Sequence, residues 1–271
     1  MSEPEENYLA RSFRDVDRGA TRKMAHCLEY LDALPSFQRY KNLILEAMNP
    51  QPGQVTADLG CGLGFDVLRL ARLVGPQGRA IGVDASLTLL QLARLPSHDS
   101  TAVEFVNTDI QKLPFQDGSL HSCKVDRTLQ HVERPASVLH EMFRTVRSGG
   151  VVVCAEPDWG TFTIDHENRA MVRQIAEFWE ESFRNPWMGR QVNNGLREAG
   201  FLDIQVQGAL LIAPSWEASD KVFDIVQTAV RLAETTRNEE PLQWLSQARE
   251  RDAVRPVWSS VTLFLNVARR P

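Results

Sequence analysis

Short apolar segments alternate with amphipathic segments of helical length between positions 55 and 156, and this alternation restricts the fold more than any other feature of the chain. Strands are expected at 55–59, 79–83, 103–107, 122–125 and 151–156, with helices at 66–74, 86–95 and 135–146. Strands connected through helices run parallel in one sheet, with helices on both faces. Ligands bind beyond the carboxyl ends of such strands, so the polar segments after each strand form the candidate site.

The two ends of the chain follow other patterns. Apolar positions with a helical period predict helices over 20–48, with a break at Pro35, and over 167–184, 191–199 and 216–252. Residues 204–212 and 257–268 alternate as strands around the last of these helical stretches. We therefore expect two late strands that pair antiparallel at the sheet edge and carry a helical cap.

These patterns divide the chain into two parts. Residues 1–48 are expected to form an N-terminal helical lid, and residues 49–271 a main domain with a cap insertion at about 213–253. Tyr8, Phe13 and Arg14 in the first part suit a segment that closes over a ligand.

Composition and charge exclude several classes of protein. The chain has 271 residues, 43% hydrophobic residues and a net charge of −5, so nothing draws it generally to nucleic acid or anionic membranes. No apolar run approaches the ~20 residues that span a bilayer, and the acidic first residues do not form a secretory signal. Four scattered cysteines indicate reduced thiols and no metal site. We expect a cytoplasmic protein with a small-molecule partner; the sequence leaves a homodimer open.

The segment "TADLGCGLGFD" follows the first expected strand and contains Gly60, Gly62 and Gly64. A dinucleotide-binding turn has the pattern GxGxxG, but here the third glycine comes one residue early. Asp58 and Asp66 flank the turn and disfavour a pyrophosphate, which binds helix N-terminal N–H groups. This spacing, with the lack of a Tyr/Lys pair after the fourth strand, disfavours a nicotinamide-dependent reductase. A cationic or zwitterionic ligand fits better; a plain strand-to-helix turn is the alternative.

Acidic residues also follow the second and third strands. Asp84 lies about 20 residues after the glycine turn, where an acidic side chain binds ribose hydroxyls in this architecture. Asp109 is suited to accept a hydrogen bond from an exocyclic amine, and Ile110 and Leu113 are suited to flank a flat ring. The alternatives are a helix cap for Asp84 and an ordinary loop residue for Asp109.

The order and spacing of these motifs over roughly residues 50–160 carry a family resemblance. The quoted segments are "VTADLGCGLGFDVLRLA", "AIGVDASLTLLQLAR" and "VEFVNTDIQKLPFQDGSLHSCKVDRTLQHVERPASVLHEMFRTVRSGGVVVCAEPDW". The chain resembles the class I S-adenosylmethionine-dependent methyltransferases, in the branch around the ubiquinone/menaquinone-biosynthesis and small-molecule methyltransferases. The resemblance implies a Rossmann-like, seven-stranded, mostly parallel α/β sheet, with helices on both faces, an antiparallel last strand and a helical cap or lid.

The resemblance also implies how S-adenosylmethionine would be bound. Asp58 and the three glycines would lie beneath the methionine part and the ribose. Asp84 with Ala85 would hold the ribose hydroxyls, and Asp109 with Ile110 would contact the adenine. Asp126 and Arg127 would meet the methionine end.

Three residues are candidates for catalysis. His131 follows the fourth strand on the acceptor side and is the candidate general base, although a helix-start histidine is the alternative. Arg127 would bind an acidic substrate or the cofactor carboxylate, or pair with Glu133. Glu156, with Asp158, follows the fifth strand and is a candidate base or substrate contact. No metal ligand is expected.

The acceptor is not defined by any motif. Residues 1–48 and 213–253 are rich in Trp, Phe, Leu and Val, which favours a small apolar or aromatic acceptor. Two alternatives stay open, because the fold does not fix the chemistry: a non-methylating reaction such as cyclisation, and a non-catalytic binding protein.

Overall fold

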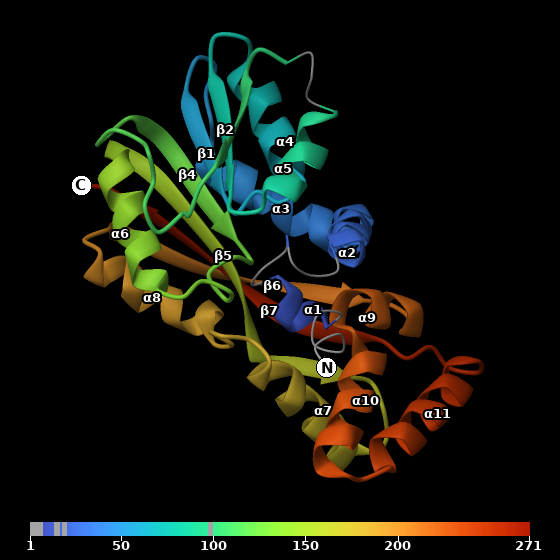
Figure 1. Cartoon of the computed structure of the whole chain (residues 1–271). Coiled ribbons are helices and arrows are strands. Elements are labelled where there is room, and N and C mark those ends of the chain that lie inside the picture. Colours follow the sequence, from blue (N-terminus) through green and yellow to red (C-terminus); the bar gives the residue numbers. More distant parts are fainter. Residues whose placement is uncertain (1–7, 14–16, 18–20, 97–99) are drawn as a thin grey trace.

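The computed structural model describes residues 8–13, 17, 21–96 and 100–271. Arg14, one of the residues expected in the lid, lies outside these ranges. Within the described residues, seven strands form one sheet in the order β3-β2-β1-β4-β5-β7-β6 (Figure 1). The strands are β1 (Val55–Leu59), β2 (Arg79–Asp84), β3 (Val103–Asn107), β4 (Leu120–Asp126), β5 (Val146–Ile164), β6 (Leu202–Ala213) and β7 (Ser259–Arg269).

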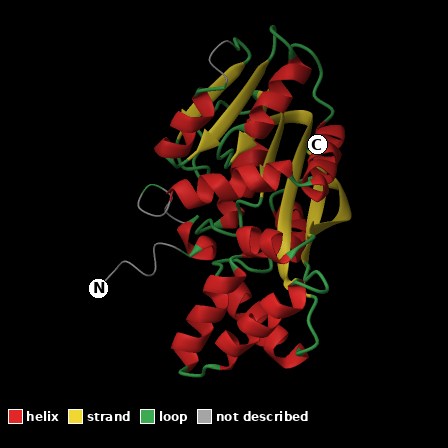
Figure 2. Cartoon of the chain, turned by 90° about the vertical axis from the view of Figure 1, so that its right-hand side faces the viewer, coloured by secondary structure: helices red, strands yellow, loops and turns green. Residues whose placement is uncertain are grey.

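The helices surround this sheet and extend beyond one end of it (Figure 2). They are α1 (Leu9–Ser12), α2 (Thr21–Ala33), α3 (Pro35–Met48), α4 (Phe65–Val74), α5 (Leu87–Arg94), α6 (Pro135–Thr145), α7 (Arg169–Glu181), α8 (Met188–Glu198), α9 (Trp216–Phe223), α10 (Ile225–Thr236) and α11 (Glu240–Asp252). Pro35 begins α3, where its missing N–H is tolerated, and this explains the predicted break after α2.

Strands β1 to β5 run parallel, and β7 runs antiparallel to both β5 and β6. The predicted fold class is therefore confirmed, including the antiparallel last strand. The fifth strand is much longer than the predicted 151–156, because it continues through the "EPDWG" segment to Ile164. Beyond Ala155 it pairs only with β7, since β4 has ended, so Pro157 lies where one side of the strand needs no partner.

The two faces of the sheet are covered by different helices. Val151, Val153 and Ala155 of β5 belong to a core cluster that also contains side chains of α3 and α4. Val152 and Cys154, which alternate with them, belong to a second cluster with α6 and α8. Residues 1–48, expected to form one lid, differ in what they contact: α3 packs against β4, β5 and β6 of the sheet, whereas α2 packs against the helices α1, α3, α5 and α9.

A helical lobe continues the sheet at the end that carries the long parts of β5, β6 and β7 (Figure 1). Helices α9 to α11 connect β6 to β7, and α7, which the sequence patterns did not assign to a cap, packs against α10 and α11. The core cluster runs without interruption from the sheet into this lobe. None of the helices in the described residues is long and apolar enough to cross a membrane.

Candidate active site

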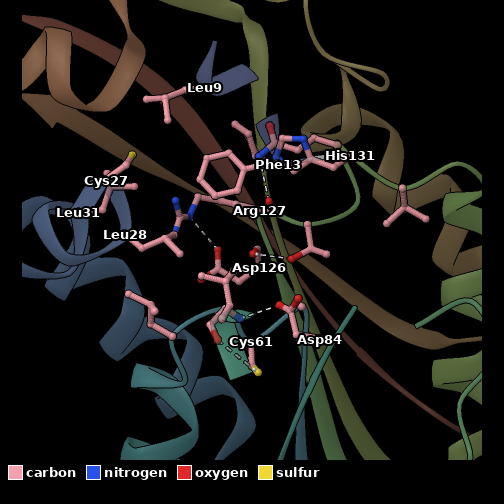
Figure 3. Close-up of a pocket in the computed structure, with 18 of the residues that line it drawn as sticks. Leu9, Phe13, Cys27, Leu28, Leu31, Cys61, Asp84, Asp126, Arg127 and His131 are labelled. Carbon is pink, nitrogen blue, oxygen red and sulfur yellow. Dashed lines mark hydrogen bonds and ion pairs between the residues drawn. The ribbon is translucent and has the colours of Figure 1, made fainter. Parts of the chain in front are cut away.

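A cavity of about 400 Å³ lies at the carboxyl ends of β1, β2 and β4, beneath α1 and α2 (Figure 3). Most of the residues predicted for the site line it: Asp58, Gly60, Gly62, Asp84, Ala85, Asp109, Ile110, Asp126, Arg127 and His131. Gly64 and Glu156 are not among the lining residues. Topology accounts for this grouping, because parallel strands bring their carboxyl ends to one edge.

The glycine turn makes close backbone contacts that a side chain would block. Gly60 has a φ of 75°, and a β-carbon there would lie 2.3 Å from Oγ1 of Thr128. Gly60 therefore lets the turn after β1 approach the loop after β4. Gly64 has a φ of 71° and faces Phe105 and Ala93, so its role in this structure is the packing of α4 against its neighbours.

Asp84 connects the glycine turn to the start of α5. One carboxylate oxygen accepts a hydrogen bond from the N–H of Gly62 at 2.8 Å, and the other accepts one from Ser86 at 2.9 Å. Burial raises the pKa of Asp84. Ser86 caps α5, because its Oγ accepts a hydrogen bond from the N–H of Leu89 at 3.1 Å. Each carboxylate oxygen keeps a lone pair for a hydroxyl of a ligand.

Asp109 and Ile110 lie at the neighbouring strand end. Asp109 is exposed, and its carboxylate accepts a hydrogen bond from the N–H of Gln111 at 2.9 Å. Ile110 is buried against the cavity and offers it an apolar surface.

A buried cluster of charges forms the floor of the cavity. Lys124 of β4 is 1% exposed; its Nζ lies 2.6 Å from Asp66 and 3.0 Å from Asp58. Lys41 of α3 joins Asp66 to Asp126. Burial opposes ionisation of Asp66, but the two lysines outweigh it and hold the pKa of that carboxyl well below its usual range. Burial prevails at Asp58 and raises its pKa to about 6.

The sequence patterns gave no role to either lysine and placed Asp66 only as a carboxylate that flanks the glycine turn. The signal was nevertheless present, because "HSCKVD" places Lys124 inside an apolar strand, where a charge needs a partner. Its partner follows from the register, in which Lys124 of β4 lies beside Asp58 of β1.

Arg127 directly follows β4 and has a φ of 51°, a conformation that is strained for residues with a side chain. Its Nε donates a hydrogen bond to Oη of Tyr40 at 3.1 Å, and its guanidinium lies 4.9 Å from the ring centroid of Phe37. None of the ion pairs among the described residues joins Arg127 to Glu133, which is exposed.

Glu156 is fully buried and contacts backbone instead of the cavity. Its Oε1 accepts hydrogen bonds from the N–H groups of Thr128 at 2.8 Å and Leu129 at 2.7 Å, and its Oε2 lies 3.4 Å from the N–H of Gln130. Burial raises its pKa to about 8. The structure thus gives Glu156 a different setting from the predicted substrate contact: it holds the loop that leads to His131.

The other end of the cavity is aromatic. Trp159 stacks on Phe183 with ring centroids 4.5 Å apart, and Phe13 and Phe183 flank the ring of His131 at 5.5 and 5.6 Å. Trp159 also donates a hydrogen bond to Gln130 at 2.7 Å. Further lining side chains at this end are Trp179, Phe223, Leu211, Val222 and Val261. Asp158 does not line the cavity; it pairs with Arg190.

Comparisons with known proteins agree with this geometry. A methyltransferase-domain family matches residues 50–226. The chain is 34% identical over 275 residues to an uncharacterized 37.1 kDa protein in transposon Tn4556 of Streptomyces fradiae, covering 99% of this chain and 78% of that protein. It is 33% identical over 177 residues to a demethylmenaquinone methyltransferase of Oceanobacillus iheyensis, covering 64% and 71% of the two chains.

Solved structures share the fold. A putative methyltransferase of Bacillus halodurans superposes with a TM-score of 0.60 at 19% identity, over 85% of this chain and 98% of that one. The 4+2 cyclase SpnF superposes with a TM-score of 0.53 at 19% identity, over 86% and 81%. The chain belongs to the class I S-adenosylmethionine-dependent methyltransferase family. S-adenosylmethionine is accordingly its cofactor, and the expected enzyme class is confirmed.

The residues present fit this cofactor. The turn after β1 offers backbone without side chains at Gly60 and Gly62, where a β-carbon would meet its neighbours. The cavity beside it is lined by carboxylates, which suit a ligand with a sulfonium and an ammonium group.

Proposed function

We propose that this enzyme transfers a methyl group to a small, apolar or aromatic acceptor. The observation that carries the proposal is the continuity of one cavity, which is charged at the glycine turn and aromatic at Trp159 and Phe183. Such a cavity holds a charged nucleoside and a flat apolar molecule end to end.

We assign the charged end to the cofactor. Asp84 would bind the ribose hydroxyls and Ile110 would contact the adenine, while Asp126 and the backbone of Gly60 would face the methionine part. When bound, S-adenosylmethionine would supply a methyl group attached to a sulfonium, from which a neutral thioether departs as a good leaving group. The chain then has to align the acceptor and exclude water; alignment alone contributes up to about 7–11 kcal/mol.

We assign the aromatic end to the acceptor. Trp159 and Phe183 offer flat faces, and α1 closes over them with Leu9 and Phe13. In this proposal α1 with Phe13 is the lid, a narrower element than residues 1–48, because α3 covers the sheet. His131 stands at the boundary of the two ends and is placed to accept a proton from the acceptor.

The test combines binding with product detection. Calorimetry should show binding of S-adenosylhomocysteine, and incubation with methyl-deuterated S-adenosylmethionine and a panel of hydroxynaphthalenes and phenols should give products heavier by one labelled methyl group. Absence of cofactor binding contradicts the proposal. Cofactor binding with no methylated product over the whole panel would favour the alternative of a non-methylating reaction.

A further inference from the structure

Charge is distributed unevenly along the cavity. The aspartates that line it come from the strand ends and from α2 and α4: Asp32, Asp58, Asp66, Asp84, Asp109 and Asp126. The ionisable groups that line the aromatic end are Arg127, His131 and Arg184, with Glu133 exposed at the rim. The carboxylates of the first end suit the cationic cofactor. The arginines of the second end favour an anionic ligand.

The cations of the cavity differ in what they already bind. Lys124 and Lys41 are each held between carboxylates of the floor. The Nε of Arg127 faces Tyr40 and lies 3.5 Å from Asp126. In the part of the chain that the structure describes, the two terminal amino groups of Arg127 make no hydrogen bond; the only hydrogen bond of its guanidinium is the one from Nε to Tyr40.

The surroundings of Arg127 fix its side chain in place. The ring of Phe37 lies against the guanidinium, and Figure 3 shows the side chain reaching across the cavity towards Leu28 and Leu31 of α2. Its side chain is 20% exposed. A guanidinium that is held by an aromatic face, among apolar neighbours, binds an anion more strongly than one in water.

We infer that the acceptor is an organic anion, an aromatic carboxylate whose two oxygens are bound by the terminal amino groups of Arg127. This inference rests on the proposed function and names the acceptor class for the same cavity. The planar fork of a guanidinium matches a carboxylate through two parallel hydrogen bonds. The strained backbone at Arg127 is consistent with a residue held for a ligand.

The experiment compares hydroxynaphthoates with their own carboxamides, which keep the shape and lose the charge. Binding is measured by calorimetry to the full chain saturated with S-adenosylhomocysteine, so that the cofactor end is filled. Wild type should bind the acids about 10- to 100-fold more tightly than the amides. Arg127→Gln should remove this preference and change the affinity for S-adenosylhomocysteine by less than about threefold.

Two further variants separate the fork from general effects. Arg127→Lys keeps the charge but not the fork, and should retain a smaller preference for the acids. Arg173→Gln changes an exposed arginine of α7 that does not line this cavity, and should behave as wild type. Glutamine and arginine are both unbranched at Cβ and meet the same strain at the positive φ of position 127. Arg127→Gln is therefore expected to fold.

Several results would overturn the inference. One is equal binding of acid and amide to wild type, or no binding of any acid. Another is a preference that persists in Arg127→Gln while S-adenosylhomocysteine binds more weakly, because Arg127 would then serve the methionine carboxylate. Methylation of neutral acceptors with no preference for acids refutes the anion and leaves the proposed function standing. A preference in binding without methylated product of either class supports the anion and refutes the proposed function.

Discussion

The two ends of the cavity are built in opposite ways. At the cofactor end, residues between Asp58 and Asp126 act through carboxylates, buried lysines and bare backbone, and most lie at or near the ends of consecutive parallel strands. At the acceptor end, aromatic rings from Phe13 to Phe223 converge from helices and strands far apart in the chain. Local motifs therefore specify the first end, and long-range packing specifies the second. This difference lets one fold keep a cofactor while its acceptor changes.

The two ends also differ in what stabilises them. Burying charges is costly, so the lysine–aspartate floor contributes an ordered arrangement more than net stability. Stacked and edge-to-face rings such as Trp159 and Phe183 add about 0.5–1.5 kcal/mol per pair beyond the burial of their area. Variants that separate these two contributions test the comparison.

The strongest test removes the central cation of the cofactor end. Lys124→Met should lower the free energy of unfolding by about 3–5 kcal/mol, because Asp58 would stay buried without a cationic partner and Asp66 would keep only Lys41 and Arg69. Urea unfolding followed by circular dichroism measures this loss. Lys112→Met, at an exposed position, is the matched control. A loss below about 1 kcal/mol would show that the floor does not depend on Lys124.

The second test concerns Glu156, which holds the loop between the two ends. Because the pKa of Glu156 is raised to about 8 by burial, the folded state keeps a proton that the unfolded state releases above about 4.5. Stability from this group is therefore lost as pH rises from about 4.5 to 8. Glu156→Gln should reduce the fall in unfolding free energy over this range by about 2–4 kcal/mol.

Urea unfolding at several pH values measures this dependence for wild type and Glu156→Gln. Glu234→Gln, at an exposed position of α10, should keep the wild-type dependence. An identical pH dependence in Glu156→Gln and wild type would refute the assignment.

The third test acts on the acceptor end alone. His131→Gln should lower kcat by about 10²-fold for acceptors that lose a proton, because a general base contributes about 10²–10⁴. Affinity for S-adenosylhomocysteine should stay within about threefold of wild type. His140→Gln, on the exposed face of α6, is the control. An unchanged kcat would leave His131 as a packing residue between Phe13 and Phe183.

The same contrast explains how far the sequence predicted the structure. Strands β1 and β3 match their predicted ranges, and the candidate cofactor residues meet at one edge because parallel topology places strand ends together. The length of β5 was missed, because the apolar run ends at Glu156 and the rest of the strand depends on its pairing with β7, which lies far away in the chain. Lys124 lies inside a strand, whereas ligands in this fold bind at strand ends, so no site motif includes it. The stack of Trp159 on Phe183 depends on tertiary contacts that no local period reveals.

The variant with the smallest expected effect tests whether the contact between Asp17 and α5 influences both ends of the cavity. Asp17 accepts hydrogen bonds from Oγ of Ser86 at 2.6 Å and from the N–H of Leu87 at 3.0 Å, at the start of α5 and beside Asp84. Phe13, four positions before Asp17, lies against His131. Asp17 is exposed, so its contribution is small, of the order of a helix cap.

Asp17→Ala should speed dissociation of S-adenosylhomocysteine by about two- to fivefold, measured by stopped-flow displacement, because the start of α5, which lies beside Asp84, loses the carboxylate that accepts its hydrogen bonds. Glu29→Ala, at an exposed position of α2, is the control. An unchanged dissociation rate would show that the contact of Asp17 with α5 does not help to retain the cofactor. The hydrogen bond from the N–H of Leu9 in α1 to Asp224 would then remain as the contact that holds this end of the chain. If Asp17→Ala also raises KM for the acceptor, Asp17 influences both ends of the cavity. Asp17 itself contacts α5 at the cofactor end, and Phe13 lies at the acceptor end.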